Sequence, residues 1–440
     1  MVPMAKTGRK FRRVSVSAVR SKDSMSSVDH ILENAKLFTA TSGEPIDEAT
    51  VWVHDGRIRY VGRSDGLPPT PASAQIHDLS GKFVMPGMTE AHAHLSFADA
   101  SPFAIGNSPV EESTITAVHN ARLMLASGFT TAISFGSTYK IDVALRNAID
   151  AGSLIGPRLL AAGRDLGATA SNVDSDGGLS QIEDGPWALR KAVREQRKLG
   201  VDIVKIFIDG EAINPTNPPG ELSFTDEEVN AIVDEAHRRT LRVACHARSA
   251  AAVKQAVRAG VELIGHANYL DSEAVDMLAE KGDTVFVGPA IAWEVTYLEK
   301  CESLGVSKET VRAQGYEAEI EATIATVGKL RAAGVKLVVG GDYGISIAPH
   351  GTYAKDLQYF VELFGMSNAE ALICATRNGG LAFDKSGDYG TLEVDTAADL
   401  VIVDGDPLED IRVLQDQSKL MVMRAGRLYA DLSDDRSGLR

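Results

Sequence analysis

The middle of the chain alternates short apolar runs with helical patterns, and this alternation constrains the fold more than any other feature of the sequence. Continuous Val/Ile/Leu runs that each follow an amphipathic helical segment indicate parallel strands buried on both faces. Eight such units predict an α/β fold of the (β/α)8 barrel type. The predicted strands are 83–94, 130–136, 157–163, 201–210, 241–247, 261–267, 283–289 and 335–342.

Both ends of the chain have a different residue pattern, which predicts short alternating strands and turns in 29–80 and again from 390 onward. Asp55-Gly56 lies between two alternating runs, which is a strong hairpin signal. Two strand-rich ends around a long middle predict one small β-sandwich domain composed of both. We therefore expect a composite β domain from 29–82 and 385–432, and a barrel from 83–384.

The charge distribution separates the first residues from the rest. The formal net charge is −15, and the first 22 residues contribute seven positive charges, so the remainder carries −22. An acidic body argues against nucleic acid as a partner. Residues 1–28 read as a basic, disordered tail, although 1–27 would also suit an organelle transit peptide.

The cysteine pattern and the absence of long apolar runs indicate in which kind of cellular compartment the protein is expected. Cys245, Cys301 and Cys374 are odd in number and widely spaced, so they form neither a disulfide framework nor a CxxC metal pair. A reducing, cytoplasmic location is expected. No run of 18 apolar residues occurs, which excludes a membrane-spanning helix of the usual kind.

Six residues at or near the ends of the predicted strands form a candidate metal site. Chemistry in such barrels occurs at the carboxyl ends of the strands, where these side chains would converge. Imidazoles and a carboxylate make a mixed N/O set suited to divalent transition metals. The candidates are His92, His94, Lys205, His246, His266 and Asp342. Taken singly, a core histidine or a helix-capping aspartate would explain several of them equally well.

Lys205 is the unusual member, because an ammonium group only donates and cannot bind a cation. Carbamylation of its nitrogen by CO2 would convert it into a carboxylate able to bridge two metals. A buried lysine is costly unless it is paired or neutralised. The alternative is a lysine that reaches solvent or pairs with Asp202 or Asp209.

These residues and their flanking motifs resemble the amidohydrolase superfamily over nearly the whole chain. The motif "PGMTEAHAH" is similar to that family's first-strand signature, and "GFTTAISFG", "GSLIGPRLLAAG", "GHANYLD" and "ADLVIVDGDPLEDI" also match. The pattern is most similar to the branch with imidazolonepropionase-like proteins, Xaa-Pro dipeptidases and ochratoxinase.

The resemblance implies two divalent metal ions. His92, His94 and Asp342 would hold one ion, and His246 and His266 the other. N6-carboxylated Lys205 and a hydroxide would bridge them. We expect the metal to be zinc, with manganese, cobalt or iron as alternatives.

Two loops depart from the family pattern. The stretch 166–178 lacks the histidine usual after the third strand, and the loop 209–224 after Lys205 is acidic and rich in proline. These differences do not affect the candidate metal ligands. They do mean that the identity of the substrate cannot be inferred from the family.

The expected reaction is hydrolysis of an amide-type C–N bond by the bridging hydroxide, with Asp342 as general base and acid. The substrate would be a small molecule: a dipeptide, an N-acyl amino acid or an aryl amide. Alternatives are a cyclic amide, urea or carbamate hydrolase acting on phenylurea-like compounds, and more remotely a metal-free scaffold. A homo-oligomer is expected by analogy.

Three further residues are candidates for substrate contact. Tyr269 could donate to the developing oxyanion or simply pack at a strand end. Arg248 could bind a substrate carboxylate or pair with acids such as Asp209. His350, on the loop after the eighth strand, could contact the substrate.

Overall fold

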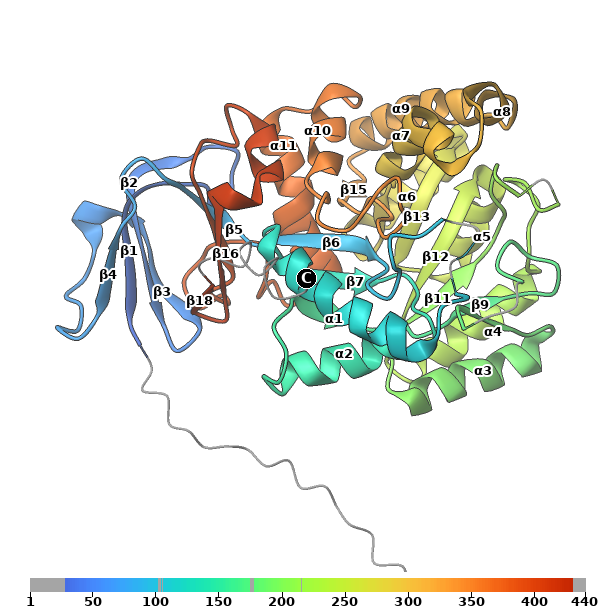
Figure 1. The fold of residues 1–440 in the computed structure, drawn as a ribbon, viewed down its shortest axis with the longest axis horizontal. Coiled ribbons are helices and arrows are strands. Elements are labelled where there is room, and N and C mark those ends of the chain that lie inside the picture. Colours follow the sequence, from blue (N-terminus) through green and yellow to red (C-terminus); the bar gives the residue numbers. More distant parts are fainter. Residues whose placement is uncertain (1–27, 102–103, 105, 175–177, 215, 430–440) are drawn as a thin grey trace, which may run out of the picture.

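The computed structural model describes residues 28–101, 104, 106–174, 178–214 and 216–429 (Figure 1). The predicted basic tail therefore lies, except for Val28, outside the described residues. Figure 1 shows a sheet at one side of the molecule and, beside it, a larger body of strands surrounded by helices. Within the described residues, no helix is both long and apolar enough to cross a lipid bilayer.

The small domain is built on one eight-stranded sheet that takes strands from both ends of the chain. The strand order is β18-β17-β16-β5-β1-β2-β3, with β4 paired to β1. The predicted hairpin at Asp55-Gly56 joins β2 to β3, and both turn residues have positive φ, at 49° and 71°. The strands are β1 (His30–Leu37), β2 (Ile46–His54), β3 (Arg57–Arg63), β4 (Gln75–Asp78), β5 (Phe83–Pro86), β16 (Leu400–Val403), β17 (Leu420–Arg424) and β18 (Arg427–Tyr429).

All eight predicted barrel strands are present, and consecutive strands pair in parallel except between the third and fourth and between the eighth and first. The first differs from its prediction, because 83–94 forms two strands: β5 pairs with β16 in the small domain and only β6 enters the barrel. The chain changes sheets at Gly87, where a Cβ would meet Thr130 Oγ1 at 2.0 Å. The barrel strands are β6 (Met88–Ala93), β7 (Phe129–Ser134), β8 (Arg158–Leu160), β11 (Ile203–Phe207), β12 (Arg242–Ser249), β13 (Leu263–Tyr269), β14 (Phe286–Gly288) and β15 (Lys336–Leu337).

Two backbone contacts close the ring of barrel strands. The strands form a three-stranded sheet, β6-β7-β8, and a seven-stranded sheet that also includes the short β9 (Asp165–Gly167) and β10 (Ser180–Ile182). Ala91 N donates to Val339 O at 2.9 Å at one junction, and Asp202 N donates to Ala161 O at 2.8 Å at the other. The fold is a (β/α)8 barrel with an appended β domain.

Helices surround the barrel strands (Figure 1). Several of them begin at side-chain caps. The helix α4, for example, starts with a capping box in which Thr225 and Glu228 bond each other's backbone. The helices are α1 (Val110–Ala126), α2 (Ile141–Asp150), α3 (Pro186–Leu199), α4 (Asp226–His237), α5 (Ala250–Ala259), α6 (Ser272–Glu280), α7 (Ile291–Lys300), α8 (Lys308–Ala313), α9 (Tyr316–Ala332), α10 (Lys355–Glu362), α11 (Asn368–Ile373) and α12 (Gly379–Phe383). The three cysteines are buried and free.

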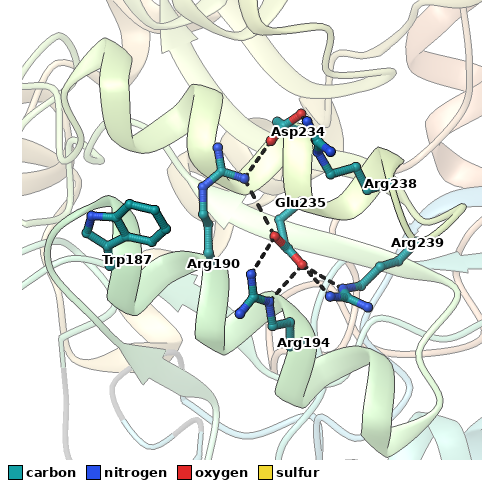
Figure 2. Close-up of a pocket in the computed structure, with 7 residues that line it drawn as sticks. All are labelled: Trp187, Arg190, Arg194, Asp234, Glu235, Arg238 and Arg239. Atoms are coloured by element: carbon teal, nitrogen blue, oxygen red, sulfur yellow. Dashed lines mark hydrogen bonds and ion pairs between the residues drawn. The ribbon is translucent and has the colours of Figure 1, made fainter.

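An ion-pair network ties α3 to α4 on the outer surface of the barrel. Figure 2 shows Arg190 and Arg194 of α3 directed at Asp234 and Glu235 of α4. Arg194 Nε lies 2.8 Å from Glu235 Oε1, and Arg190 Nη1 lies 3.6 Å from Glu235 Oε2. The Arg194 hydrogen bond, reinforced by Arg239, lowers the pKa of Glu235 to about 2. The network therefore depends on an ionised Glu235.

Candidate metal centre

His92, His94 and Asp342 come together as one cluster of ligand-type atoms. His94 Nε2 lies 3.2 Å and His92 Nε2 lies 3.6 Å from Asp342 Oδ1. Each of the three residues offers one ligand-type atom, and these atoms lie within 4.8 Å of one another. His94 Nδ1 donates to the carbonyl of Gly136 at 3.0 Å, which leaves its Nε2 lone pair free for a cation.

The backbone at the end of the eighth strand brings Asp342 close to the first strand. A Cβ at Gly340 would lie 2.8 Å from His92 N, so only a glycine permits this approach. Gly341 N donates to Glu90 Oε1 at 3.2 Å, and His92 N donates to the same oxygen at 3.1 Å. Glu90, which the sequence analysis did not single out, thus fastens the first strand to the eighth. The signal in the sequence was an acidic residue within the predicted first strand, two residues before His92.

A second cluster of ligand-type atoms contains His246, His266 and Glu211. His246 and His266 were predicted, and their ring centroids lie 4.3 Å apart. Glu211 was not predicted; its Oε1 lies 3.6 Å from His246 Nδ1. The two clusters adjoin, because the rings of His92 and His266 have centroids 5.2 Å apart.

Burial of the histidines favours their neutral form, which is the form able to bind a cation. It lowers the pKa values of His92, His246 and His266 well below 6.5. His92 Nδ1 and both ring nitrogens of His266 are buried without a hydrogen-bond partner among the described residues. Leaving a buried polar atom unpaired costs about 1–3 kcal/mol, which a bound cation would offset. This donor set therefore fits divalent metal ions.

The backbone at His266 is itself unusual. His266 and the following Ala267 have φ values of 77° and 55°, which are rare for residues other than glycine. Such conformations cost on the order of 1–3 kcal/mol and cluster at functional sites. The strain lies at the strand end that presents the unpartnered imidazole.

Asp342 is an ionised member of the site. Burial alone would raise its pKa, but the nearby His92 and His94 outweigh this effect, and the pKa of Asp342 is lowered. Its side chain is 21% exposed, whereas those of His92 and His94 are buried. The accessible carboxylate can therefore meet a substrate or water.

Lys205 is fully buried between two aromatic rings. Its Nζ lies 4.4 Å from the ring centre of Phe207 and 5.0 Å from that of Phe135. These two rings stack on His246 and His92 respectively, so the lysine reaches the place where the two clusters adjoin. Its hydrogen bond is to the carbonyl of Phe135, at 3.4 Å.

The alternative partners considered for Lys205 are engaged elsewhere. Asp202 pairs with Arg146, and Asp209 accepts hydrogen bonds from the backbone of Arg248 and Ser249. Asp165 is a further buried carboxylate near Lys205 that the sequence analysis missed, and burial raises its pKa to about 6.

Arg248 pairs with acidic side chains in the structure. Its guanidinium is 0% exposed and pairs with Glu211, Glu294 and Glu319, and its contact with a substrate carboxylate stays a prediction. The partners differ from the predicted Asp209, whose carboxylate accepts from the backbone N of Arg248 at 2.8 Å. Helix-borne Glu294 and Glu319 carry no local sequence signal for this pairing.

His350 and Tyr269 occupy different surroundings. His350 is 6% exposed, and its ring nitrogens contact Tyr353 Oη at 2.6 Å and Phe97 O at 3.2 Å. Tyr269 ends β13 and is 37% exposed. Contact of either residue with substrate stays a prediction.

The family model described as "Amidohydrolase family" matches residues 83–429. The chain belongs to the amidohydrolase family. The match spans the barrel and the C-terminal strands of the composite sheet, and it makes the protein a hydrolase of this family.

Relatives within this family cover most of the chain. Ochratoxinase of Aspergillus niger is 27% identical over 427 residues, which cover 90% of this chain and 85% of the relative. Its crystal structure superposes with a TM-score of 0.82 at 25% identity and covers 91% of this chain and 95% of that chain. Imidazolonepropionase of Xanthomonas campestris pv. campestris is 26% identical over 423 residues, or 87% of this chain and 94% of the relative.

A solved prolidase structure is similar over the same extent. This prolidase, complexed with N-methylphosphonate-L-proline, has a TM-score of 0.82 and 28% identity, and it covers 91% of this chain and 99% of that chain. The branch predicted from the sequence motifs is confirmed.

Proposed function

We propose that this amidohydrolase is a binuclear metal-dependent enzyme that cleaves an amide-type C–N bond in a small molecule. The observation that carries the proposal is the adjoining pair of ligand clusters, with buried imidazole nitrogens that lack any partner among the described residues. A dipeptide, an N-acyl amino acid or an aryl amide is the proposed substrate, in keeping with the prolidase and ochratoxinase relatives.

His92, His94 and Asp342 would hold one ion, and His246 and His266 the other. We propose that Lys205 is carboxylated and contributes to both, since it is buried between the two rings that stack on the clusters and donates its hydrogen bond to a backbone carbonyl. Divalent cations supply Lewis acidity toward a carbonyl oxygen and lower the pKa of water.

Asp342 would move the proton in this reaction. Its lowered pKa keeps it ionised, and its carboxylate is the accessible one of its cluster. As the water oxygen bonds to the carbonyl carbon, Asp342 takes the water proton. It then passes that proton to the amine nitrogen as the C–N bond breaks.

Tyr269 would donate a hydrogen bond to the developing oxyanion. Burial raises the pKa of its hydroxyl, which therefore keeps its proton at neutral pH. Its half-exposed position at the end of β13, three residues after His266, is consistent with a donor facing the substrate.

Metal content and turnover on a defined panel test the proposal together. The purified protein, reloaded with Zn²⁺, would be measured by elemental mass spectrometry and assayed on dipeptides, N-acyl amino acids, aryl amides and phenylureas. About two ions per chain with release of amine from an amide substrate supports the proposal. Turnover of phenylureas alone would favour the urea-hydrolase alternative, and a metal-free, inactive chain would favour a scaffold.

Zinc as the resident metal, a homo-oligomer and a cytoplasmic location remain predictions. Elemental analysis without added metal tests the first, and light scattering after gel filtration tests the second.

A further inference from the structure

We infer that Glu211 is an additional protein ligand of the second metal ion and completes, with His246 and His266, a set of three. This inference rests on the proposed binuclear function and deepens it, because the resemblance to the family assigned that ion only two histidines and the bridging lysine.

The contacts of Glu211 place a carboxylate where a cation would need it. Its Oε1 lies 3.6 Å from His246 Nδ1, and the ligand atoms of all three residues lie within 4.8 Å of one another. His266 is 1% exposed, and neither of its ring nitrogens has a partner among the described residues. Two imidazoles with one carboxylate form a common three-residue set for a catalytic divalent metal.

Hydrogen bonds fix the backbone of the loop after the fourth barrel strand, and so fix the position of Glu211. Glu211 N donates to Asn217 O at 3.0 Å, which turns the loop back on itself. A Cβ at Gly210 would lie 1.7 Å from that same oxygen, so the turn requires glycine. Asp209 is fixed in turn by accepting from Arg248 N at 2.8 Å. The position of Glu211 is thus a property of the fold.

Arg248 acts as a positioning residue for Glu211. Its Nη2 lies 3.3 Å from Glu211 Oε1, while its Nη1 bonds Glu294 and Glu319, both of which are 0% exposed. Metal-binding carboxylates are commonly held by such hydrogen-bonding partners.

The test compares Glu211→Gln with Glu221→Gln, an exposed glutamate of the same loop that loses the same charge. Zn²⁺ affinity is measured by competition with a chromogenic chelator, and Zn²⁺ content by elemental mass spectrometry after dialysis. We expect two ions per chain in the wild type and in Glu221→Gln. We expect about one in Glu211→Gln, with the second ion bound roughly 100-fold more weakly or worse.

A second readout separates ligation from a structural role. The visible spectrum of the Co²⁺-loaded protein should change in Glu211→Gln and stay unchanged in Glu221→Gln, while the metal-free melting temperatures stay close to each other. If Glu211→Gln binds two Zn²⁺ ions with wild-type affinity, the inference about Glu211 is wrong, but the proposed binuclear function still stands. A wild type that binds no Zn²⁺ would instead overturn the proposed function.

Discussion

His94 Nε2 lies 3.2 Å from Asp342 Oδ1, although the two residues belong to opposite ends of the barrel sequence. The first and eighth strands are neighbours only because the barrel closes, at the bond from Ala91 N to Val339 O. Ring closure therefore brings together His92, His94 and Asp342, the cluster on which the proposed reaction depends.

Asp342→Asn should lower kcat on an amide substrate by about 10²–10⁴-fold, because the amide side chain cannot accept the water proton. Metal content, measured on the same samples, distinguishes loss of proton transfer from loss of an ion. A variant with full metal content and wild-type turnover would show that another residue moves the proton.

Lys205→Ala should lose most of its bound Zn²⁺, since the proposed carboxylated side chain would contribute to both ions. Reconstitution of the metal-free wild type should also depend on bicarbonate, because the carbamate forms from CO2. Elemental analysis with and without bicarbonate checks both expectations. If Lys205→Ala binds as much Zn²⁺ as the wild type, the lysine is not a ligand, and His246, His266 and Glu211 would be sufficient to bind the second ion.

Arg248→Met should reduce the free energy of unfolding by about 3–5 kcal/mol, because it leaves Glu294 and Glu319 buried without their cation. Urea denaturation measures this change. Arg238→Met is the matched control: Arg238 is 70% exposed, and its removal should change stability by less than about 1 kcal/mol. A stable Arg248→Met protein with a raised KM for carboxylate substrates would instead support the predicted role of Arg248 in substrate binding.

The α3–α4 network should lose stability as the pH falls. The pKa of Glu235 is lowered to about 2, below its ordinary value, so its contribution is complete above about pH 5 and is lost as the pH falls toward 2. The difference in urea stability between wild type and Glu235→Gln should shrink between pH 6 and pH 3. For the exposed control Glu227→Gln, the difference in urea stability from the wild type should not change in this way with pH. A difference for Glu235→Gln that stays constant between pH 6 and pH 3 would contradict the prediction.

Local sequence patterns are sufficient to locate much of the site. His92-Ala93-His94 presents two imidazoles on one face because strand side chains alternate with period two. His246 and His266 follow apolar runs whose carboxyl ends must meet in a parallel barrel.

Other features depend on contacts that no local pattern encodes. Glu211 sits on an irregular loop, whose direction follows from the turn at Gly210. The split of 83–94 into β5 and β6 reflects competition between two sheets for one apolar run.

The sequence by itself determined the order of strands and helices, the barrel and most members of the two clusters of ligand-type side chains, because apolar periodicity and strand-end position are short-range properties of the chain. Only the tertiary structure decided which charges meet, as when Arg248 pairs with Glu294 and Glu319 from two helices. The reason is physical: a buried charge is stabilised by whichever opposite charge the packed helices bring within reach, and that pairing is set by the fold as a whole.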